Sequence, residues 1–440
     1  MREVLLSNYL VSFIPLPTDS SEDLFKYSLV ICYNKGGGHV ENIGIIGLGK
    51  LGLPLAAVIA EAGYTVSGVD YDQSLINKLQ NHAFGYDEPN LNDILTKHAH
   101  KIEFGTDYKL LINADIVYII LPTPSDTFGN FDDSLIVTAV KNLLKIWKYR
   151  ESGKTIVVVS TLMPQTCEKK LQPLLDLETN SLKIKLLYSP EFIALGSVIT
   201  NLKNPDMVLI GANSPIDANL HLKIQKSIIG EHHFKILTLT EAEIVKLLVN
   251  CYVTMKISFA NFVGEIGDTL GPAVDSISIA NALGMDSRIG PKYIRPGLGF
   301  GGPCFPRDNK ALIAWSNKLG LSADLAQGTV SINDRQPIHM AERIYRHFKQ
   351  YRNIGILGYA YKINSSVTEE SQRILLANIL AQKGLNISVY DPLVHSPTEF
   401  SSGIIVCSTI SELSNCDLIV TSKDYAQYFD TAFTGKYFFI

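Results

Sequence analysis

The run Gly47-Leu-Gly-Lys-Leu-Gly52 constrains the fold of this 440-residue chain more than any other feature. It follows a short apolar run, residues 43–46, and leads into an apolar stretch, residues 53–60, whose pattern predicts a helix. A second apolar run ends at Asp70, about 20 residues after the glycines. A strand, a glycine turn, a helix and another strand in this order begin a parallel, doubly wound sheet. We therefore predict an α/β fold.

Further apolar strands are predicted over residues 114–121 and 155–160. Each runs into a loop rich in Pro, Ser and Thr, residues 121–126 and 160–166. Ligands of open parallel sheets bind beyond the carboxyl ends of the strands. We therefore expect these two loops to face a ligand.

The glycine run predicts a dinucleotide site. Glycines permit the tight turn and let a pyrophosphate reach the helix N-terminus, where unpaired N–H groups and the helix dipole favour anions. Asp70 would accept two ribose hydroxyls and would repel a 2′-phosphate. We therefore expect NAD, rather than NADP, as the cofactor.

The chain is predicted to have four parts. Thr240 to about Leu270 reads as one long helix that starts with a capping box of Thr240 and Glu243. A helix of about 30 residues is too long for one small domain to cover, so we expect it to link domains and support a dimer. A core helix of a single domain is the alternative. The predicted parts are an extension at 1–40, a NAD-binding Rossmann domain at 41–235, a central, mostly helical dimerisation domain at 236–335 and a Rossmann-like domain at 336–440.

The last part repeats the first. Residues 353–358 resemble residues 42–47, and residues 387–391 resemble residues 66–70. Gly358-Tyr-Ala-Tyr-Lys362 replaces the glycine run. We expect a second Rossmann-like sheet that holds no dinucleotide and whose loops hold the nucleotide portion of a substrate.

The two ends of the chain leave alternatives open. In residues 1–40, the apolar run Leu10–Leu16 is interrupted by prolines, and Gly36–Gly38 is expected to act as a flexible joint. The segment is a poorly ordered extension, the product of a start codon placed too far upstream, or a signal peptide. The strand-like end, Lys436–Ile440, is either a natural edge or a truncation.

Composition narrows the function classes. The net charge of −4 gives no basic field for nucleic acid. No apolar run reaches the roughly 18 residues needed to span a bilayer. The six cysteines are scattered without a Cys-x-x-Cys pair, so we predict neither a metal site nor a disulfide framework. This pattern fits a reducing cytoplasm.

Cys304 lies on a glycine-rich turn, Gly299–Asp308. Small residues would let a substrate approach the backbone, and the nearby Arg307 is expected to favour the thiolate, the form that attacks carbonyls. The alternative is a tight turn around a buried, inert thiol. The thiol and the NAD site together suggest oxidation through a thiol-bound intermediate.

With these segments the chain resembles the nucleotide-sugar dehydrogenases, the superfamily that includes UDP-glucose 6-dehydrogenase and GDP-mannose dehydrogenase. The matching stretches follow family order across residues 42–440: Gly47–Pro54, Leu121–Pro124, Ser160–Thr161, Ser189–Phe192, Glu243–Lys246, Asn250, Lys256–Phe259, Gly299–Asp308, Tyr361–Lys362 and Tyr390–Pro392. The resemblance implies a NAD-dependent, four-electron oxidation of a sugar 6-hydroxyl to the acid. The steps would pass through a thiohemiacetal and a thioester of Cys304.

The resemblance also implies residue roles. The catalytic set would be Cys304, Glu191, Lys246, Asn250, Asp308 and Thr161, with Glu191 as the base for the hydrolytic water and Thr161 and Asp308 holding that water. The cofactor set would be Gly47, Gly49, Lys50, Leu51, Gly52, Asp70, Pro122, Thr123 and Thr161. The substrate set would be Arg288, which would reach a neighbouring subunit's substrate, with Arg295, Phe300, Gly301, Tyr361 and Lys362.

Each role has a plainer alternative: Glu191 as a charge at a helix N-terminus, Lys246 as a solvated residue and Thr161 as a cap. Leu195, Met207 and Glu369 depart from the commoner family pattern, and Glu369 puts a negative charge where a cation is usual. Lys362 or Arg373 would compensate, or the sugar nucleotide would sit differently.

The departures leave the substrate open. Our order is UDP-glucose, oxidised to UDP-glucuronate, then a UDP-N-acetylhexosamine (the ManNAc or GlcNAc form), then GDP-mannose. A two-electron alcohol dehydrogenase and a catalytically silent NAD-binding scaffold are the alternatives from other classes. We expect a homodimer or dimer-based oligomer in the cytoplasm that supplies polysaccharide biosynthesis, with neither nucleic acid nor membrane as a partner.

Overall fold

The computed structural model describes residues 2–6, 9–15, 27–32, 41–83, 88–148, 153–178, 183–394, 400–428 and 436–440. The chain forms two compact units, Met1–Glu41 and Asn42–Ile440. The first contains β1 (Arg2–Leu6), β2 (Tyr9–Pro15) and β3 (Tyr27–Cys32), paired as an antiparallel sheet of their own. The predicted joint at residues 36–38 lies outside the described residues, and the poor order of the extension stays a prediction.

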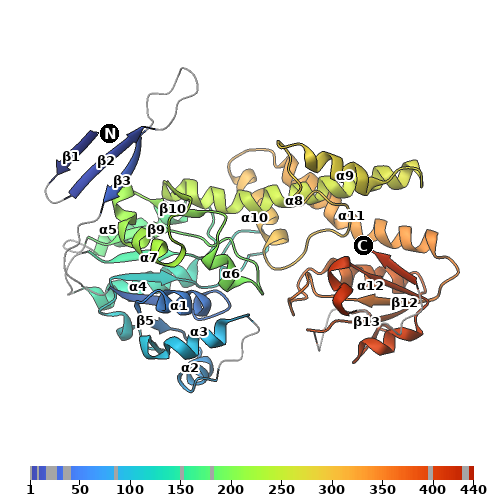
Figure 1. Ribbon diagram of the computed structural model, residues 1–440, viewed down its shortest axis with the longest axis horizontal. Helices are drawn as coiled ribbons and strands as arrows, with labels where there is room; N and C mark the ends of the chain where they lie inside the picture. The colour runs from blue at the N-terminus through green and yellow to red at the C-terminus, as the bar shows by residue number, and fades with distance from the viewer. Residues whose placement is uncertain are drawn as a thin grey trace. The chain divides into compact units, whose positions relative to one another are not determined.

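The second unit begins with an eight-stranded sheet (Figure 1). Its strands are β4 (Asn42–Ile46), β5 (Thr65–Val69), β6 (Ile102–Gly105), β7 (Ile116–Ile119), β8 (Thr155–Val158), β9 (Lys185–Tyr188), β10 (Val208–Ala212) and β11 (Phe234–Leu237). The order is β11-β10-β9-β8-β7-β4-β5-β6, and only the β9–β10 pair is antiparallel. From β6 to β9 this is the strand order of a dinucleotide-binding sheet. The predicted doubly wound α/β fold is confirmed.

Helices cover both faces of this sheet. One core cluster packs it against α1 (Gly52–Glu61), α3 (Leu91–His98), α6 (Val198–Lys203) and α7 (Asn219–Ile229). The other packs it against α4 (Ser134–Trp147), the π-helical turn η3 (Cys167–Leu171) and α5 (Gln172–Glu178). The short α2 (Gln73–Gln80) follows β5. Strands that are covered on both faces have continuous apolar sequences, and such sequences could be recognised as strands before the fold was known.

The central part consists of α8 (Leu239–Leu270), α9 (Ser276–Met285), α10 (Phe305–Lys318) and α11 (Asp324–His347). The predicted long helix is present, but its predicted capping box is wrong. Thr238 caps the helix and pairs with Glu241, whose carboxylate accepts the Thr238 N–H at 2.9 Å. The carboxylate of Glu243 is turned into the protein instead, where it bonds to another segment.

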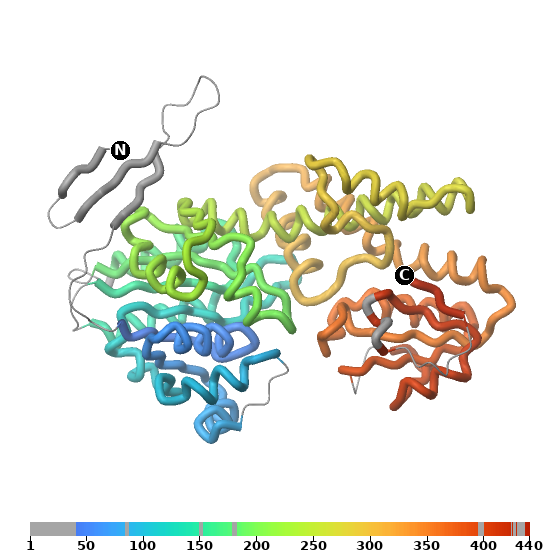
Figure 2. Tube along the Cα trace, in the orientation of Figure 1, coloured from blue at the N-terminus to red at the C-terminus, as the bar shows by residue number. Residues whose placement is uncertain are grey.

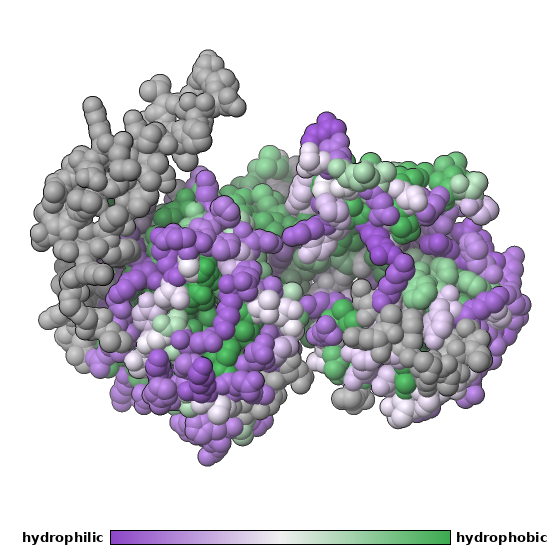
Figure 3. Space-filling view, in the orientation of Figure 1, coloured by the Kyte–Doolittle hydropathy of each residue, from purple (hydrophilic) through white to green (hydrophobic). Residues whose placement is uncertain are grey.

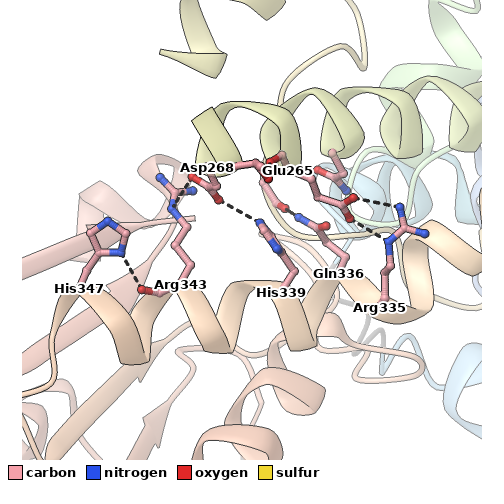
Figure 4. Close-up of polar contacts among 10 residues, drawn as sticks. Glu265, Asp268, Arg335, Gln336, His339, Arg343 and His347 are labelled. Atoms are coloured by element: carbon pink, nitrogen blue, oxygen red, sulfur yellow. Dashed lines mark hydrogen bonds and ion pairs between the residues drawn. The ribbon is translucent and has the colours of Figure 1, made fainter. Parts of the chain in front are cut away.

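Polar contacts fasten α8 to α11 (Figure 4). Arg335 makes a bidentate pair with Glu265 at 2.9 and 3.0 Å. One turn further along, Asp268 is 2.9 Å from Nε2 of His339 and 3.4 Å from Nε of Arg343. These contacts join the far half of α8 to the helix that leads into the last domain.

The last domain contains a five-stranded parallel sheet. Its trace is drawn from orange to red in Figure 2. It contains β12 (Asn353–Leu357), α12 (Gln372–Gln382), β13 (Asn386–Tyr390), β14 (Ile405–Val406), β15 (Leu418–Thr421) and β16 (Lys436–Phe439) in the order β14-β13-β12-β15-β16. The predicted repeat of the first sheet is therefore present.

The second sheet fills its own dinucleotide position with protein. A Cβ at Gly358 would overlap the ring of Tyr425, and the Tyr425 hydroxyl lies 3.2 Å from Asp391. Asp391, the counterpart of Asp70, also accepts the backbone N–H groups of Tyr359 and Ala360 at 2.8 and 2.9 Å. This packing supports the prediction that the last domain holds no dinucleotide.

By length and composition, α8 is the one helix of the described chain that could cross a membrane. A core helix of a soluble protein passes the same test. Glu243 and Asn261 of α8 are buried, and Leu247 and Cys251 pack against Phe131 and Ala311. One side of α8 therefore packs in the core, whereas large apolar side chains on it such as Tyr252 and Phe259 are exposed.

Candidate active site

The glycine run forms the predicted turn between β4 and α1. Gly47 has φ +93°, and a Cβ there would overlap the carbonyl of Ile120. A Cβ at Gly52 would overlap the carbonyl of Gly47, whereas one at Gly49 would point into open space. The first and third glycines are thus required by the turn itself, and the second leaves an approach free for a ligand.

The start of α1 suits a dinucleotide phosphate. Its N-cap, Leu51, makes no side-chain capping bond, and its first turn carries no acidic residue. Asp70 follows β5 and accepts the N–H groups of Leu48 and Asp72 at 2.8 and 3.0 Å, which holds its carboxylate beside the glycine turn. An uncapped helix N-terminus next to a ribose-binding carboxylate fits NAD.

The two predicted ligand loops are bonded to each other. Ser160 Oγ accepts the N–H of Leu121 at 2.9 Å and donates to the Leu121 carbonyl at 2.7 Å. Thr123 Oγ1 donates to the carbonyl of Thr161 at 2.8 Å. The loops after β7 and β8 therefore form one surface beyond the carboxyl ends of the strands, on which Pro122, Thr123 and Thr161 lie together.

The glycines around Cys304 serve the protein's own packing. A Cβ at Gly299 would overlap Oδ1 of Asn333, one at Gly301 the carbonyl of Glu370, and one at Gly302 the ring of Tyr361. Gly302 also has φ +82°. The close approach that we expected between substrate and backbone is therefore made here by other segments of the chain, and it fixes the turn.

Cys304 is exposed and stands at the N-terminus of α10. Arg307 favours the thiolate, as expected of a nearby positive charge, but it does not set the net direction. Desolvation by the surrounding protein raises the pKa of the thiol, and this effect outweighs Arg307 and Lys246, which lower it. Asp308 and Glu369 add to the rise. The thiol therefore needs a proton acceptor, or loses its proton as it attacks.

Asn250 and Asp308 meet across α8 and α10. Nδ2 of Asn250 donates to Oδ2 of Asp308 at 2.6 Å, and Nη2 of Arg307 lies 3.2 Å from Oδ1. Asp308 is 1% exposed. The Arg307 guanidinium also stacks on the Phe131 ring at 4.6 Å. These contacts fix the direction of the Asn250 amide.

Lys246 joins the opposite side of the site. Its Nζ donates to the carbonyl of Glu191 at 2.6 Å and lies 4.7 Å from the ring centre of Phe192. Burial lowers the pKa of Lys246, and the charges of Asp308, Cys304 and Glu191 oppose that change. Burial raises the pKa of Glu191 to about 7, against the effect of Lys246. A carboxylate with such a pKa is suited to general-base catalysis near neutral pH.

The predicted substrate residues lie in different places. Arg288 is exposed and forms a bidentate pair with Asp286. Arg295 lines a pocket of about 1000 Å³ together with Arg343, Arg346, His347 and Lys423. Nζ of Lys362 donates to the carbonyl of Leu195, which lines another pocket of about 720 Å³ with Lys50. Phe300 is buried, and its N–H donates to Asn333 at 2.7 Å.

The family departures also find places in the structure. The carbonyl of Glu369 accepts the Gly302 N–H at 3.0 Å, which puts Glu369 beside the Cys304 turn. Glu370, not Glu369, pairs with a cation, Lys310, at 3.1 Å. Arg373 bonds to Ser422 and Ala360. Compensation for Glu369 by Lys362 or Arg373 stays a prediction. Nothing in the structure explains Met207.

Sequence reasoning missed three supporting residues. Asn333 bonds to both the N–H and the carbonyl of Phe300 and so holds the Cys304 turn. The ring of Phe131 packs against the Arg307 guanidinium. Glu243 accepts two N–H groups of the segment after β8. A polar residue at a helix position that faces the core is expected to bond to another segment. Asn333 and Glu243 could have been predicted as supporting residues on this ground. Phe131 carried no comparable signal.

Comparisons with known proteins agree with this geometry. Models of the UDP-glucose/GDP-mannose dehydrogenase family match residues 41–229 (NAD binding domain), 240–335 (central domain) and 355–436 (UDP binding domain). A UDP-glucose 6-dehydrogenase from Haloferax volcanii is 28% identical over 397 residues, which cover 88% of this chain and 92% of that protein.

Solved structures show the same fold. A UDP-glucose dehydrogenase from Pyrobaculum islandicum superposes with a TM-score of 0.80 at 26% identity, covering 90% of this chain and 93% of the other. A UDP-N-acetyl-mannosamine dehydrogenase from Staphylococcus aureus superposes with a TM-score of 0.72 at 24% identity over 87% of this chain and 88% of the other. The chain therefore belongs to the UDP-glucose/GDP-mannose dehydrogenase family of NAD-dependent oxidoreductases that act on nucleotide sugars.

Proposed function

We propose that the enzyme oxidises the 6-hydroxyl of a UDP-sugar to the carboxylate in two steps, with UDP-glucose as the first candidate and UDP-glucuronate as the product. The observation that carries the proposal is the constellation at the α8–α10 junction: the exposed thiol of Cys304 with Lys246, Asn250 and Asp308 around it. An ordinary two-electron alcohol dehydrogenase would not need the thiol, and a silent scaffold would not need this set.

NAD, when bound, accepts one hydride in each of the two oxidations. In the first, a base takes the proton of the sugar hydroxyl, Lys246 and Asn250 stabilise the negative charge that develops on the oxygen, and loss of hydride from the same carbon gives the aldehyde. Cys304 then adds to the aldehyde carbon and gives a thiohemiacetal. The second oxidation converts that carbon to a thioester. Water attacks the thioester, the C–S bond breaks, and Cys304 regains its proton while the sugar acid leaves.

Glu191 is the base for this water. Its pKa of about 7 lets it hold a proton transiently at neutral pH and release it again. Asp308 and Thr161 are proposed to hold the water. Asp308 already has one oxygen toward Asn250 and the other toward Arg307, so it acts as an acceptor with a fixed direction.

The substrate class rests on the last domain and on the positive pocket of Arg295. The family model there describes a UDP binding domain, and Arg295, Arg346 and Lys423 supply cations for a diphosphate in a pocket that Asp268, paired with Arg343, and Asp275 also line. A UDP-N-acetylhexosamine is the second candidate, because Glu369 and Leu195 change the surroundings of the sugar site relative to the commoner family pattern. The roles of Arg288, Tyr361 and Lys362 in substrate binding are part of this proposal.

A homodimer is proposed through α8. Large apolar side chains are exposed along it at helical spacing, namely Leu248, Tyr252, Phe259, Phe262, Ile266 and Leu270. Hydrophobic surface over the α8–α9 region is visible in Figure 3. Exposed apolar patches of this kind mark interfaces. The cytoplasm, and supply of a polysaccharide precursor, are proposed as the setting.

A panel of sugar nucleotides, scored by NADH formation and by the product acid, tests the proposal. UDP-glucose should give the highest kcat/KM, followed by the UDP-N-acetylhexosamines and then GDP-mannose. If no member of the panel produces NADH, the proposal fails. If a UDP-N-acetylhexosamine exceeds UDP-glucose, the second candidate replaces the first.

A further inference from the structure

We propose that Glu243 is a positioning residue for the final, hydrolytic step, because it fixes the loop of Thr161 against the helix of Lys246. The inference rests on the proposed function. Glu243 is 0% exposed on α8. Its Oε2 accepts the N–H of Gln165 at 2.6 Å and its Oε1 accepts the N–H of Cys167 at 2.8 Å. One carboxylate thus holds two backbone amides of another segment.

Those amides belong to the segment that carries Thr161. The chain leaves β8, passes Ser160 and Thr161, and enters the π-helical turn η3 at Cys167. Gln165 has φ +77°, a left-handed conformation that a residue other than glycine rarely adopts. Such a conformation persists where the surroundings enforce it. The bond from the Gln165 N–H to Glu243 holds this conformation from α8, while Lys169 donates to the Gln165 carbonyl at 2.9 Å and to its side chain at 2.7 Å from within the same segment.

The same turn of α8 holds the second catalytic loop. Glu243 and Lys246 are three residues apart and lie on one side of the helix. Lys246 donates to the carbonyl of Glu191, in the loop after β9, at 2.6 Å. Glu243 therefore binds the loop of Thr161, and Lys246 binds the loop of Glu191, to the same turn of α8. Thr161 is proposed to hold the hydrolytic water and Glu191 to activate it. Because both loops are bonded to this turn of α8, the turn sets the distance between the two residues.

A carboxylate is the side chain that this position requires. Two N–H groups need two acceptors, and both oxygens of a carboxylate accept. Glutamine offers one acceptor and would turn its NH₂ toward the other amide. Glu243 has no part in capping α8, because Glu241 makes that contact, and its burial is explained by the two bonds it accepts. Burial raises its pKa to about 7, while hydrogen bonds from the amide and the thiol of Cys167 and from the amide of Gln165 oppose the rise.

The test compares Glu243→Gln with Glu241→Gln. Both glutamates are on α8 and both accept a backbone N–H, but Glu241 bonds to Thr238, the residue that caps the same helix. Three measurements are made on each full-length variant: hydrogen exchange of residues 160–172 with NAD bound, the pre-steady-state NADH burst with the best sugar nucleotide, and the intact mass of the enzyme during turnover.

Glu243→Gln should exchange faster over residues 160–172. It should still give a burst of two NADH per active site, followed by a steady state about 100-fold slower than in the wild type. The mass spectrum should show the sugar acyl group on Cys304. KM for the sugar nucleotide should change little. Glu241→Gln should match the wild type in all three measurements.

The inference would be overturned if Glu243→Gln showed the hydrogen exchange of the wild type. It would also be overturned if the variant kept the steady-state rate of the wild type and accumulated no acyl enzyme. A loss of the burst itself would also overturn it, because it would place the effect before hydrolysis. Where Glu243→Gln does not fold, Glu243→Asp decides by the same readouts: it keeps the charge but is too short to reach both amides. If the wild type oxidises no sugar nucleotide, the proposed function fails, whereas hydrogen exchange still reports whether Glu243 holds the loop.

Discussion

Nδ2 of Asn250 lies 2.6 Å from Oδ2 of Asp308, and this contact sets which way the amide of Asn250 faces. A carboxylate only accepts hydrogen bonds, so the NH₂ group must point to Asp308. The other Asp308 oxygen is 3.2 Å from Arg307, which prevents the carboxylate from turning away. A sugar oxygen would therefore meet an amide that is already oriented.

Replacing Asn250 with Asp should nearly abolish oxidation. Two carboxylates would face each other where one amide now donates, and the developing negative charge would lose a donor. We expect kcat to fall by about 100-fold or more. Steady-state kinetics with NAD and the best sugar nucleotide measure this, with Asn77→Asp on the exposed helix α2 as the control. A kcat within twofold of the wild type would remove Asn250 from the mechanism.

The hydrolytic step should depend on the ionisation of Glu191. The base must be deprotonated, and burial raises its pKa from 4.5 to about 7. Below that value most Glu191 is protonated, so the rate of thioester hydrolysis should rise with pH and level off above about 7. Single-turnover experiments across pH 5–9, roughly the range centred on that pKa, follow the acyl enzyme directly. Glu191→Gln should leave the acyl enzyme in place at every pH, and rapid turnover by this variant would contradict its assignment.

The thiol of Cys304 should react slowly with alkylating reagents at neutral pH. Desolvation raises its pKa, and Arg307 is the largest influence that lowers it. Arg307→Gln should therefore move the midpoint of the alkylation rate to a still higher pH. Lys318→Gln, at the other end of α10, should leave that midpoint unchanged. A lower midpoint in Arg307→Gln would show that the charges around the thiol are arranged differently.

The dimer should depend on the exposed face of α8. Phe262→Arg puts a charge among apolar side chains that we propose to be covered by a second copy. Light scattering after size-exclusion chromatography should show a dimer for the wild type and a monomer for the variant. Leu321→Arg changes an exposed leucine outside α8 and should stay dimeric. An unaltered mass for Phe262→Arg would place the interface elsewhere.

Sequence patterns identified the elements that depend on local spacing. The glycine run, the aspartate after the second strand and the repeat in the last domain all follow from turn geometry and strand burial, and each is present. The start of α8 was harder, because Thr238 with Glu241 and Thr240 with Glu243 both match a capping box. In the fold Thr238 and Glu241 form the box, while Glu243 is bonded to Gln165 and Cys167, more than 70 residues earlier in the chain.

The net pKa shifts and the contacts between distant segments could not be predicted from the sequence pattern. The sequence places Arg307 near Cys304, but it does not contain the extent to which folding removes water from the thiol. In the same way, Tyr425 could not be linked to Gly358 before the last sheet was formed. Catalytic residue types could thus be named, whereas their protonation and the residues that support them required the fold.

The ratio of NADH to sugar acid tests the central claim, a double oxidation through Cys304, most directly. Both products are quantified from one reaction of the wild type and of Cys304→Ser with the best sugar nucleotide. The account predicts two NADH per acid for the wild type and no acid for Cys304→Ser. One NADH with accumulating aldehyde in the wild type, or full acid formation by Cys304→Ser, would contradict it.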